Sequence, residues 1–387
     1  MSLELSISRM VAVVAILLTA SVAWAADAPV AVAAMNGDVE AVRTLLADGG
    51  DVNAAQGDGM TALHWAAFHG DDTLAQLLLA AKADVSATTR IGAITPLSLA
   101  ASDGNAVMIE ALVAAKANVN IPTSTGATPL MAAATSGSVD AVRVLLDHGA
   151  FVNAREIANG QTPLMFAAWE NRKDVIRLLV ERGAHTGLTS WVVSMIEPRF
   201  DDDGNPLPTR RPRAPGANSA MGGMTALLYA ARDGHKEAVR ALLEGGANID
   251  QVAGSEGSSP MVIAIANGHY TLAKDLLDAG ADPNLANIDG LAPLYATINM
   301  RFAPVSWAPN PPTAQEEVNA VELLEALLDA GADPNARIAR GLWFSPTSHN
   351  RLWIDPAGAT PFWRAAQASD VESMRPLLAA GADPDLS

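Results

Sequence analysis

The chain of 387 residues has no cysteine, which excludes disulfide bonds, a thiol nucleophile and lipid attachment through cysteine. Basic residues are also scarce. There are 25 Lys and Arg against 42 Asp and Glu, a formal net charge of −17. A nucleic-acid partner is not expected, because no basic patch is available to meet phosphates. Gly-rich phosphate-binding loops and Gly-x-Ser-x-Gly elbows are missing too, so neither catalysis nor a bound cofactor is expected.

Metal-ligand spacing is lacking as well. The seven histidines are spread along the chain without an H-x-x-x-H or HExxH pattern, so we expect no metal site. His64, which lies in a predicted helix, is expected to have a structural role. Asp201-Asp202-Asp203-Gly204-Asn205 lacks the Gly and Glu that a calcium loop needs, and is expected to be a solvated loop.

One apolar run stands out, from Met10 to Ala20 after Arg9. Together with the small-x-small triplet Ala23-Trp24-Ala25, it predicts a signal peptide over residues 1–25, cleaved between Ala25 and Ala26. The run is short for a membrane span, although an uncleaved anchor stays open as the alternative. A cysteine-free exported chain is typical of a bacterial periplasmic or secreted protein. After cleavage we expect no stable membrane insertion and a monomer.

A sequence motif recurs about every 33 residues: Thr-Pro-Leu, then Ala-Ala, then Leu-Leu, then a closing Gly-Ala. A fixed period of this length predicts one supersecondary unit stacked on itself. The position that closes each copy is held by Gly49, Lys82, Lys116, Gly149, Gly183, Gly246, Gly280, Gly331 and Gly381. The chain therefore contains nine copies.

Each copy is expected to form two short antiparallel helices. Thr followed by Pro is a good helix start, as in Thr162-Pro163, and the closing glycine is a good helix end. Small pairs such as Ala66-Ala67, Ala132-Ala133 and Ala167-Ala168 would let helices approach closely, while the Leu-Leu pairs would fill the space between copies. Pro376, within the last predicted helix, could shorten it.

These motifs resemble the ankyrin repeat. Thr61-Ala62-Leu63-His64-Trp65-Ala66-Ala67 is similar to its opening, Gly234-His235 to its mid-repeat step, and Gly331-Ala332-Asp333-Pro334-Asn335 to its close. The resemblance implies an all-α solenoid that binds proteins, like bacterial exported (periplasmic) ankyrin-repeat proteins. Lys82, Lys116 and Asn171 replace glycines of the pattern, and the two lysines would cost about 1 kcal/mol each in a left-handed conformation.

The predicted organisation follows from the spacing of the copies. Repeats 1–5 occupy 26–187, an insertion occupies 188–222, and repeats 6–9 occupy 223–387 with further insertions near 302–316 and 337–356. Insertions in repeat arrays become loops on one face, often the binding face. The second and third insertions carry the aromatic residues Trp307, Trp343, Phe344 and Trp353, which we take as candidate binding residues.

The resemblance also implies a concave binding face built by the first helices. Its variable positions, just after Ala-Ala, are candidate partner-binding residues: Phe68, His69, Asp103, Trp169, Glu170, Arg232 and Asp233. The sequence thus favours an exported, non-enzymatic scaffold for a protein partner. Three alternatives stay open. These are small-molecule or glycan binding by the Trp-rich insertions, a catalytic site that uses His349 or Asp203, and, from resemblance alone, an accessory role for an exported redox enzyme.

Overall fold

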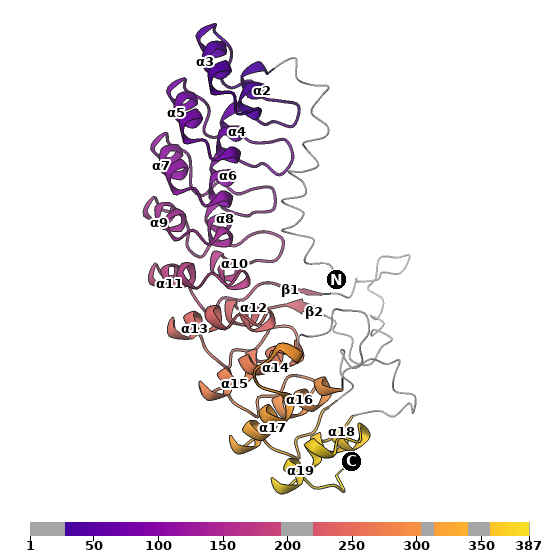
Figure 1. Cartoon of the computed structure of the whole chain (residues 1–387). Coiled ribbons are helices and arrows are strands. Elements are labelled where there is room, and N and C mark those ends of the chain that lie inside the picture. The colour runs from indigo at the N-terminus through magenta and orange to yellow at the C-terminus, as the bar shows by residue number, and fades with distance from the viewer. Residues whose placement is uncertain (1–27, 195–219, 303–312, 340–356, 387) are drawn as a thin grey trace, which may run out of the picture. The chain divides into compact units, whose positions relative to one another are not determined.

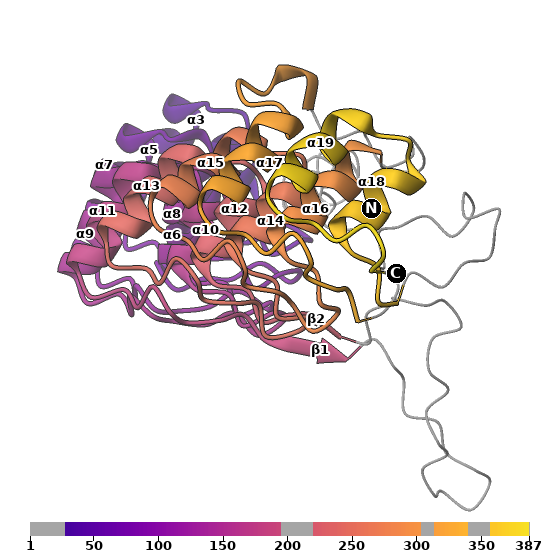
Figure 2. The ribbon, with the colours of Figure 1, turned by 90° about the horizontal axis from the view of Figure 1, so that it is seen from below.

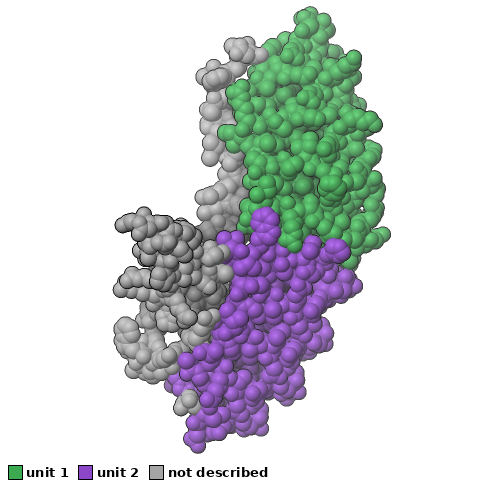
Figure 3. Space-filling model, turned by 180° about the vertical axis from the view of Figure 1, so that it is seen from behind, with its two compact units in different colours: residues 1–184 green, residues 185–387 purple. Residues whose placement is uncertain are grey.

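The computed structural model of the protein describes residues 28–194, 220–302, 313–339 and 357–386. The chain divides into two compact units, residues 1–184 and 185–387 (Figure 3). Unit 1 contains α2 (Pro29–Met35), α3 (Val39–Ala47), α4 (Ala62–His69), α5 (Asp72–Ala80), α6 (Pro96–Asp103), α7 (Ala106–Ala114), α8 (Pro129–Ser136), α9 (Val139–Asp147), α10 (Pro163–Trp169) and α11 (Lys173–Glu181).

Unit 2 contains a short β-ribbon and the remaining helices. They are β1 (Val192–Ser194), β2 (Ala220–Gly222), α12 (Ala226–Arg232), α13 (Lys236–Glu244), α14 (Pro260–Ala266), α15 (Tyr270–Asp278), α16 (Pro293–Arg301), the 3-10 helix η2 (Thr313–Gln315), α17 (Ala320–Asp329), α18 (Pro361–Gln367) and α19 (Val371–Ala379). The 18 α-helices of the described residues form nine pairs. The predicted all-α solenoid of nine two-helix repeats is therefore confirmed.

The first helix of a repeat begins where the sequence predicts it. The Thr162 hydroxyl accepts a hydrogen bond from the Met165 amide, and the same cap stands at Thr61, Thr95, Thr128, Thr225 and Thr360. Within unit 1, α2, α4, α6, α8 and α10 pack successively on one another, and α5, α7, α9 and α11 form a second column (Figure 1). Within unit 2, the columns are α12, α14, α16, α18 and α15, α17, α19. Each repeat therefore gains its stability from its neighbours.

The small and large apolar residues divide the core between them. Leu145 and Leu242, the first members of two Leu-Leu pairs, are fully buried, whereas the second members are half-buried. Most alanine pairs are fully buried, but Ala366, in the last repeat, is exposed and Ala132 is only half-buried. The fully buried pair of that repeat is Ala133-Ala134. The Ala132-Ala133 prediction was wrong by one residue, because three consecutive alanines offer two possible pairs.

The residues that replace glycine keep the left-handed backbone of the repeat. Lys82 has φ 65°, Lys116 φ 76° and Asn171 φ 56°. The lysines thus adopt the left-handed conformation on which the predicted cost depends, and the cost of roughly 1 kcal/mol each stays a prediction. Pro376, by contrast, does not shorten α19, which keeps nine residues like α13. That prediction was wrong. The proline removes one backbone donor, but the adjacent Leu377 is fully buried and α19 stays packed on α17.

Asparagine side chains clasp consecutive closing turns. Asn335 Nδ2 donates to the Gly381 carbonyl at 3.1 Å, and Asn335 Oδ1 accepts from the Asp383 amide at 2.8 Å. Asn284 makes the same two contacts one repeat earlier, to Gly331 at 2.9 Å and Asp333 at 2.8 Å. The Asp-Pro-Asn close therefore joins each of these repeats to the next one.

The first insertion is not free of regular structure at its ends. β1 and β2 pair antiparallel, with Val193 opposite Met221. Gly222 has φ 98°, and a Cβ there would lie 2.0 Å from the Trp191 carbonyl oxygen, so the ribbon needs glycine at this point. Figure 2 shows the ribbon on the side of the hairpins that link the repeats of unit 2, and the Gly254 amide donates to the Gly223 carbonyl at 2.8 Å. The sequence did not predict this ribbon.

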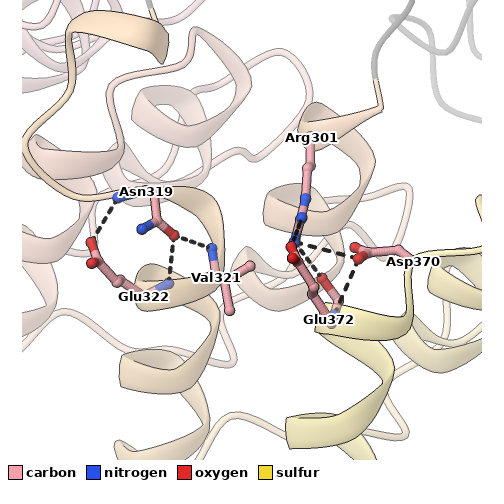
Figure 4. Close-up of polar contacts among 7 residues, drawn as sticks. Arg301, Asn319, Val321, Glu322, Asp370 and Glu372 are labelled. Carbon is pink, nitrogen blue, oxygen red and sulfur yellow. Dashed lines mark hydrogen bonds and ion pairs between the residues drawn. The ribbon is translucent and has the colours of Figure 1, made fainter.

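The segment that returns from the second insertion is anchored on repeat 7. Glu316 Oε2 accepts from the Thr271 amide at 2.7 Å, at the first turn of α15. Thr271 Oγ1 in turn accepts from the amides of Glu317 at 3.1 Å and Val318 at 3.3 Å. The capping box of Asn319 and Glu322 then starts α17 (Figure 4).

The last repeat is held to the eighth by an arginine. Arg301, at the end of α16, pairs with Asp370 at 3.4 Å and also with Glu372, near the start of α19 (Figure 4). Asp370 is almost fully buried and also caps α19 through the Ser373 amide. The second insertion is therefore flanked by two polar anchors, Arg301 before it and Glu316 after it.

Candidate functional site

The candidate site is a row of residues at the C-terminal ends of the first helices. We call the residues seven and eight positions after each first-helix N-cap the first-helix row. In unit 1, the structure places Phe68 and His69 on α4, Asp103 on α6, and Trp169 and Glu170 at the end of α10. Unit 2 places Arg232 and Asp233 at the end of α12. All seven residues that were predicted from the positions after Ala-Ala belong to this row, five in unit 1 and two in unit 2.

An aromatic cluster lies at the start of the row in unit 1. The Phe68 ring is edge-on to Trp65 with 5.7 Å between centroids, and the His69 ring stacks on Trp65 at 5.9 Å. The Trp65 indole N–H donates to Gln56 Oε1 at 3.1 Å, while His69 Nε2 lies 3.0 Å from the Met35 carbonyl oxygen. Phe68 is 37% exposed and Trp65 only 7%. Contacts with Gln56 and with Met35 of the preceding repeat thus fix Trp65 and His69, and Phe68 packs on these two rings with one side exposed to solvent.

The other unit 1 members of the row differ in character. Asp103 is exposed, and a Cβ built on Gly70 would lie 3.5 Å from Asp103 Oδ2, so this carboxylate lies beside the turn that ends α4. Trp169 and Glu170 are half-buried. The row in unit 1 therefore combines aromatic side chains, which protein interfaces favour, with acidic groups, which are less common in interface cores.

In unit 2, Arg232 and Asp233 pair with each other. Arg232 Nε and Nη2 donate to the two Asp233 carboxylate oxygens at 2.9 and 2.8 Å, and the guanidinium lies 5.2 Å from the Tyr229 ring centroid. Burial alone would lower the pKa of Arg232, but hydrogen bonding and attraction to Asp233 outweigh it and raise that pKa. Much of the binding capacity of this pair is used within its own repeat.

Four candidate residues, Trp307, Trp343, Phe344 and Trp353, lie outside the described residues, as do His349 and Asp203. Within the described ranges, no group of three or more His, Asp or Glu could hold a metal ion. No helix among the described residues is long and apolar enough to cross a bilayer.

The structural role predicted for His64 agrees with its geometry. The Thr61 amide donates to His64 Nδ1 at 3.2 Å, so Nε2 carries the proton and donates to the Ile94 carbonyl at 3.0 Å. Burial lowers the pKa of His64, which favours this neutral tautomer. His64 therefore links repeat 2 to repeat 3.

Aligning the first helices by their N-caps reveals a residue that sequence reasoning missed. Four positions after the cap, eight repeats carry an apolar or aromatic residue and the ninth carries Arg364: Val32, Trp65, Leu99, Ala132, Phe166, Tyr229, Ile263, Ala296 and Arg364. Arg364 Nε donates to the side-chain oxygen of Asn299 at 2.9 Å. Asn299 is itself the first-helix row residue of α16. The charged side chain of Arg364 at an otherwise apolar position was the sequence signal that could have identified it.

Comparison with known proteins agrees with this architecture. The model of the ankyrin repeat family (ankyrin repeats, 3 copies) matches residues 10–89, 97–190 and 211–287, which is more than half of the chain. The chain therefore belongs to the ankyrin-repeat family. Ankyrin repeats are generally protein–protein interaction modules, and the family is generally non-enzymatic.

Individual relatives match over parts of their length. An ankyrin repeat-containing protein of Treponema pallidum is 31% identical over 138 residues, 36% of this chain and 40% of the relative. A Danio rerio protein named as palmitoyltransferase ZDHHC13 is 29% identical over 169 residues, 42% of this chain and 25% of the relative. Regulatory protein NPR6 of Arabidopsis thaliana is 40% identical over 70 residues, 18% of this chain and 15% of the relative. The chain thus spans less than half the length of these relatives.

Proposed function

We propose that the protein is an exported, monomeric and non-enzymatic scaffold that binds a protein partner through the first-helix row. The observation that carries the proposal is the aromatic cluster of unit 1. Phe68 is 37% exposed on a base fixed by Trp65, His69 and Gln56. A large apolar side chain held rigidly at the surface loses little conformational entropy on binding, so it makes an efficient anchor.

The surrounding surface fits this role. Trp169 adds a second half-buried aromatic side chain, and Asp103 and Glu170 add negative charge. The aromatic residues of the insertions would extend the contact and add specificity. Export rests on the apolar run Met10–Ala20 and the Ala23-Trp24-Ala25 triplet, which favour cleavage before Ala26 and delivery to the periplasm or the outside of the cell.

Photo-crosslinking in the native cell tests the binding proposal. A photoreactive amino acid replaces Phe68 or Trp169, and the matched control is Val107, which is 60% exposed on the second helix α7. We expect the same partner band from positions 68 and 169 and none from position 107. Equal yields from all three positions, or no band at any of them, would overturn the proposal.

Fractionation tests export separately. Periplasmic or extracellular protein with an N-terminus at Ala26 supports the proposed route. An intact N-terminus in the cytoplasmic fraction contradicts it.

A further inference from the structure

Three exposed polar side chains lie next to Phe68 on the first-helix row of unit 1, where repeats 2 and 3 meet. They are His69, Ser102 and Asp103, and we call them the acceptor patch. We propose that the acceptor patch and the Phe68 ring together bind an arginine side chain of the protein partner. The inference rests on the proposed function, because it names the chemical group that this part of the row recognises.

The acceptor patch is brought together at the turn that ends α4. The first helices α4 and α6 pack on one another. A Cβ built on Gly70 would lie 3.5 Å from Asp103 Oδ2, so the carboxylate lies beside the turn that directly follows His69. The His69 ring is in turn 5.4 Å from the Phe68 ring, between centroids. One long side chain of a partner can therefore reach the carboxylate, the imidazole and the aromatic ring.

The donors of the acceptor patch are already used inside the protein. His69 Nε2 lies 3.0 Å from the Met35 carbonyl oxygen, which only accepts, so Nε2 carries a proton and donates it. In the neutral ring the other nitrogen, Nδ1, is then an acceptor. The Ser102 hydroxyl donates to the Ser98 carbonyl at 2.9 Å, and an ionised carboxylate such as that of Asp103 only accepts. The patch therefore offers acceptors, and the partner has to supply the donors.

The charge around the patch selects a cation among the possible donors. Residues 28–117, which contain the first three helix pairs, hold ten Asp and Glu and only four Lys and Arg. This excess of negative charge attracts a positively charged group. A backbone amide or a neutral side chain of the partner would supply a donor but no charge opposite the Asp103 carboxylate. A basic side chain is therefore favoured.

Arginine fits these groups better than lysine does. Its planar guanidinium can form two parallel hydrogen bonds with a carboxylate and can also stack on an aromatic ring. Phe68 is 37% exposed, and its ring is fixed by edge contacts with the rings of Trp65 and His69. An ammonium group carries the same charge but has no flat surface for the ring and no paired donors for the carboxylate. The combination of groups thus matches a guanidinium.

A titration of the purified chain with N-acetyl-arginine amide tests this subsite, followed through the histidine side-chain resonances by NMR. The comparison ligand is N-acetyl-lysine amide, which carries the same single charge, and ionic strength is kept constant. The His69 resonances should shift saturably, and the arginine compound should bind at least threefold more tightly than the lysine compound. The fully buried His64 should not respond. Equal affinity for the two compounds, or a linear drift without saturation, would overturn the guanidinium assignment.

Two matched variants locate the response. Asp103→Asn removes the charge and keeps the size of the side chain, so the affinity for the arginine compound should fall about fivefold or more. Asp140→Asn makes the same change at an exposed position of the second helix α9 and should leave the affinity unchanged. Both positions are exposed, so neither variant should alter the fold. Unchanged affinity in Asp103→Asn would contradict the subsite.

The partner supplies a second readout through photo-crosslinks from position 169, which leave Phe68 intact. These crosslinks should fall about fivefold or more in Asp103→Asn, since a charge-assisted hydrogen bond is lost, and stay unchanged in Asp140→Asn. Equal crosslinking in the two variants would refute a partner arginine at this patch, although the scaffold function would stand. A saturable response to the arginine compound with no crosslinked partner at any position would instead refute the scaffold function.

Discussion

The asparagine clasp between repeats 8 and 9 allows a prediction that can be worked out bond by bond. Asn335 makes one donor contact to the Gly381 carbonyl at 3.1 Å and one acceptor contact to the Asp383 amide at 2.8 Å. Asn335→Ala removes both and Asn335→Asp removes only the donor. The chain already contains the second arrangement, because Asp250 accepts from the Asp282 amide at 3.1 Å.

The magnitude follows from the exposure of these bonds. An ordinary hydrogen bond contributes roughly 0.5–1.5 kcal/mol net, and exposed ones lie near the lower end. Asn335→Ala should therefore lower the local stability of repeat 9 by about 1–2 kcal/mol, and Asn335→Asp by about half of that. Since repeat stability depends on nearest neighbours, the loss should stay near the last repeat.

Amide hydrogen exchange measures this directly. In Asn335→Ala the amides of α19 should exchange about 5- to 30-fold faster, while those of unit 1 keep their rates. Asn335→Asp should fall between this variant and the wild type. A loss of protection spread evenly over both units, or none in α19, would refute the clasp as a local inter-repeat device.

Three further predictions concern protonation and capping. Burial raises the pKa of Tyr270 and Tyr295 to about 12. The free energy of unfolding of unit 2 should therefore fall by on the order of 2–3 kcal/mol per tyrosine as the pH rises from about 10 to about 12. Urea unfolding measures this loss, and Tyr→Phe changes should remove it. Burial lowers the pKa of His64, so its stabilisation should be complete above about pH 6.5 and be lost as pH falls through its depressed pKa. Unfolding of His64→Gln would lack this acid-dependent step, and identical pH profiles would contradict it. Glu316→Ala should cost about 1–2 kcal/mol by removing the acceptor for the Thr271 amide, whereas Glu317→Ala should cost much less. Calorimetry showing equal losses would argue against this cap.

The sequence predicts much of the fold, because each copy of the repeat carries residues that mark both the start and the end of its helices. Thr162 marks a start and Gly183 an end within one short segment, and nine such copies reinforce one another. Errors arise where a local pattern allows two choices. The triple alanine at 132–134 is one case, and Pro376, which buried packing overrides, is another.

Contacts between distant segments are what the sequence could not predict. Glu316 reaches Thr271 across 45 positions, and Arg364 reaches Asn299 across 65. Neither pairing has a motif, because each one joins residues of neighbouring repeats that an insertion separates in the sequence. The β1–β2 ribbon was missed for a similar reason, since its two strands lie at opposite ends of the predicted insertion 188–222.

The role of the first-helix row can be tested most directly by measuring the affinity of the purified chain for its crosslinked partner. Calorimetric titration compares the wild type with Phe68→Ala, Trp169→Ala and the exposed second-helix control Val107→Ala. Loss of a rigid aromatic anchor should weaken binding about tenfold or more in the first two variants, with no change in the third. Equal affinity in all four proteins would contradict binding through the first-helix row.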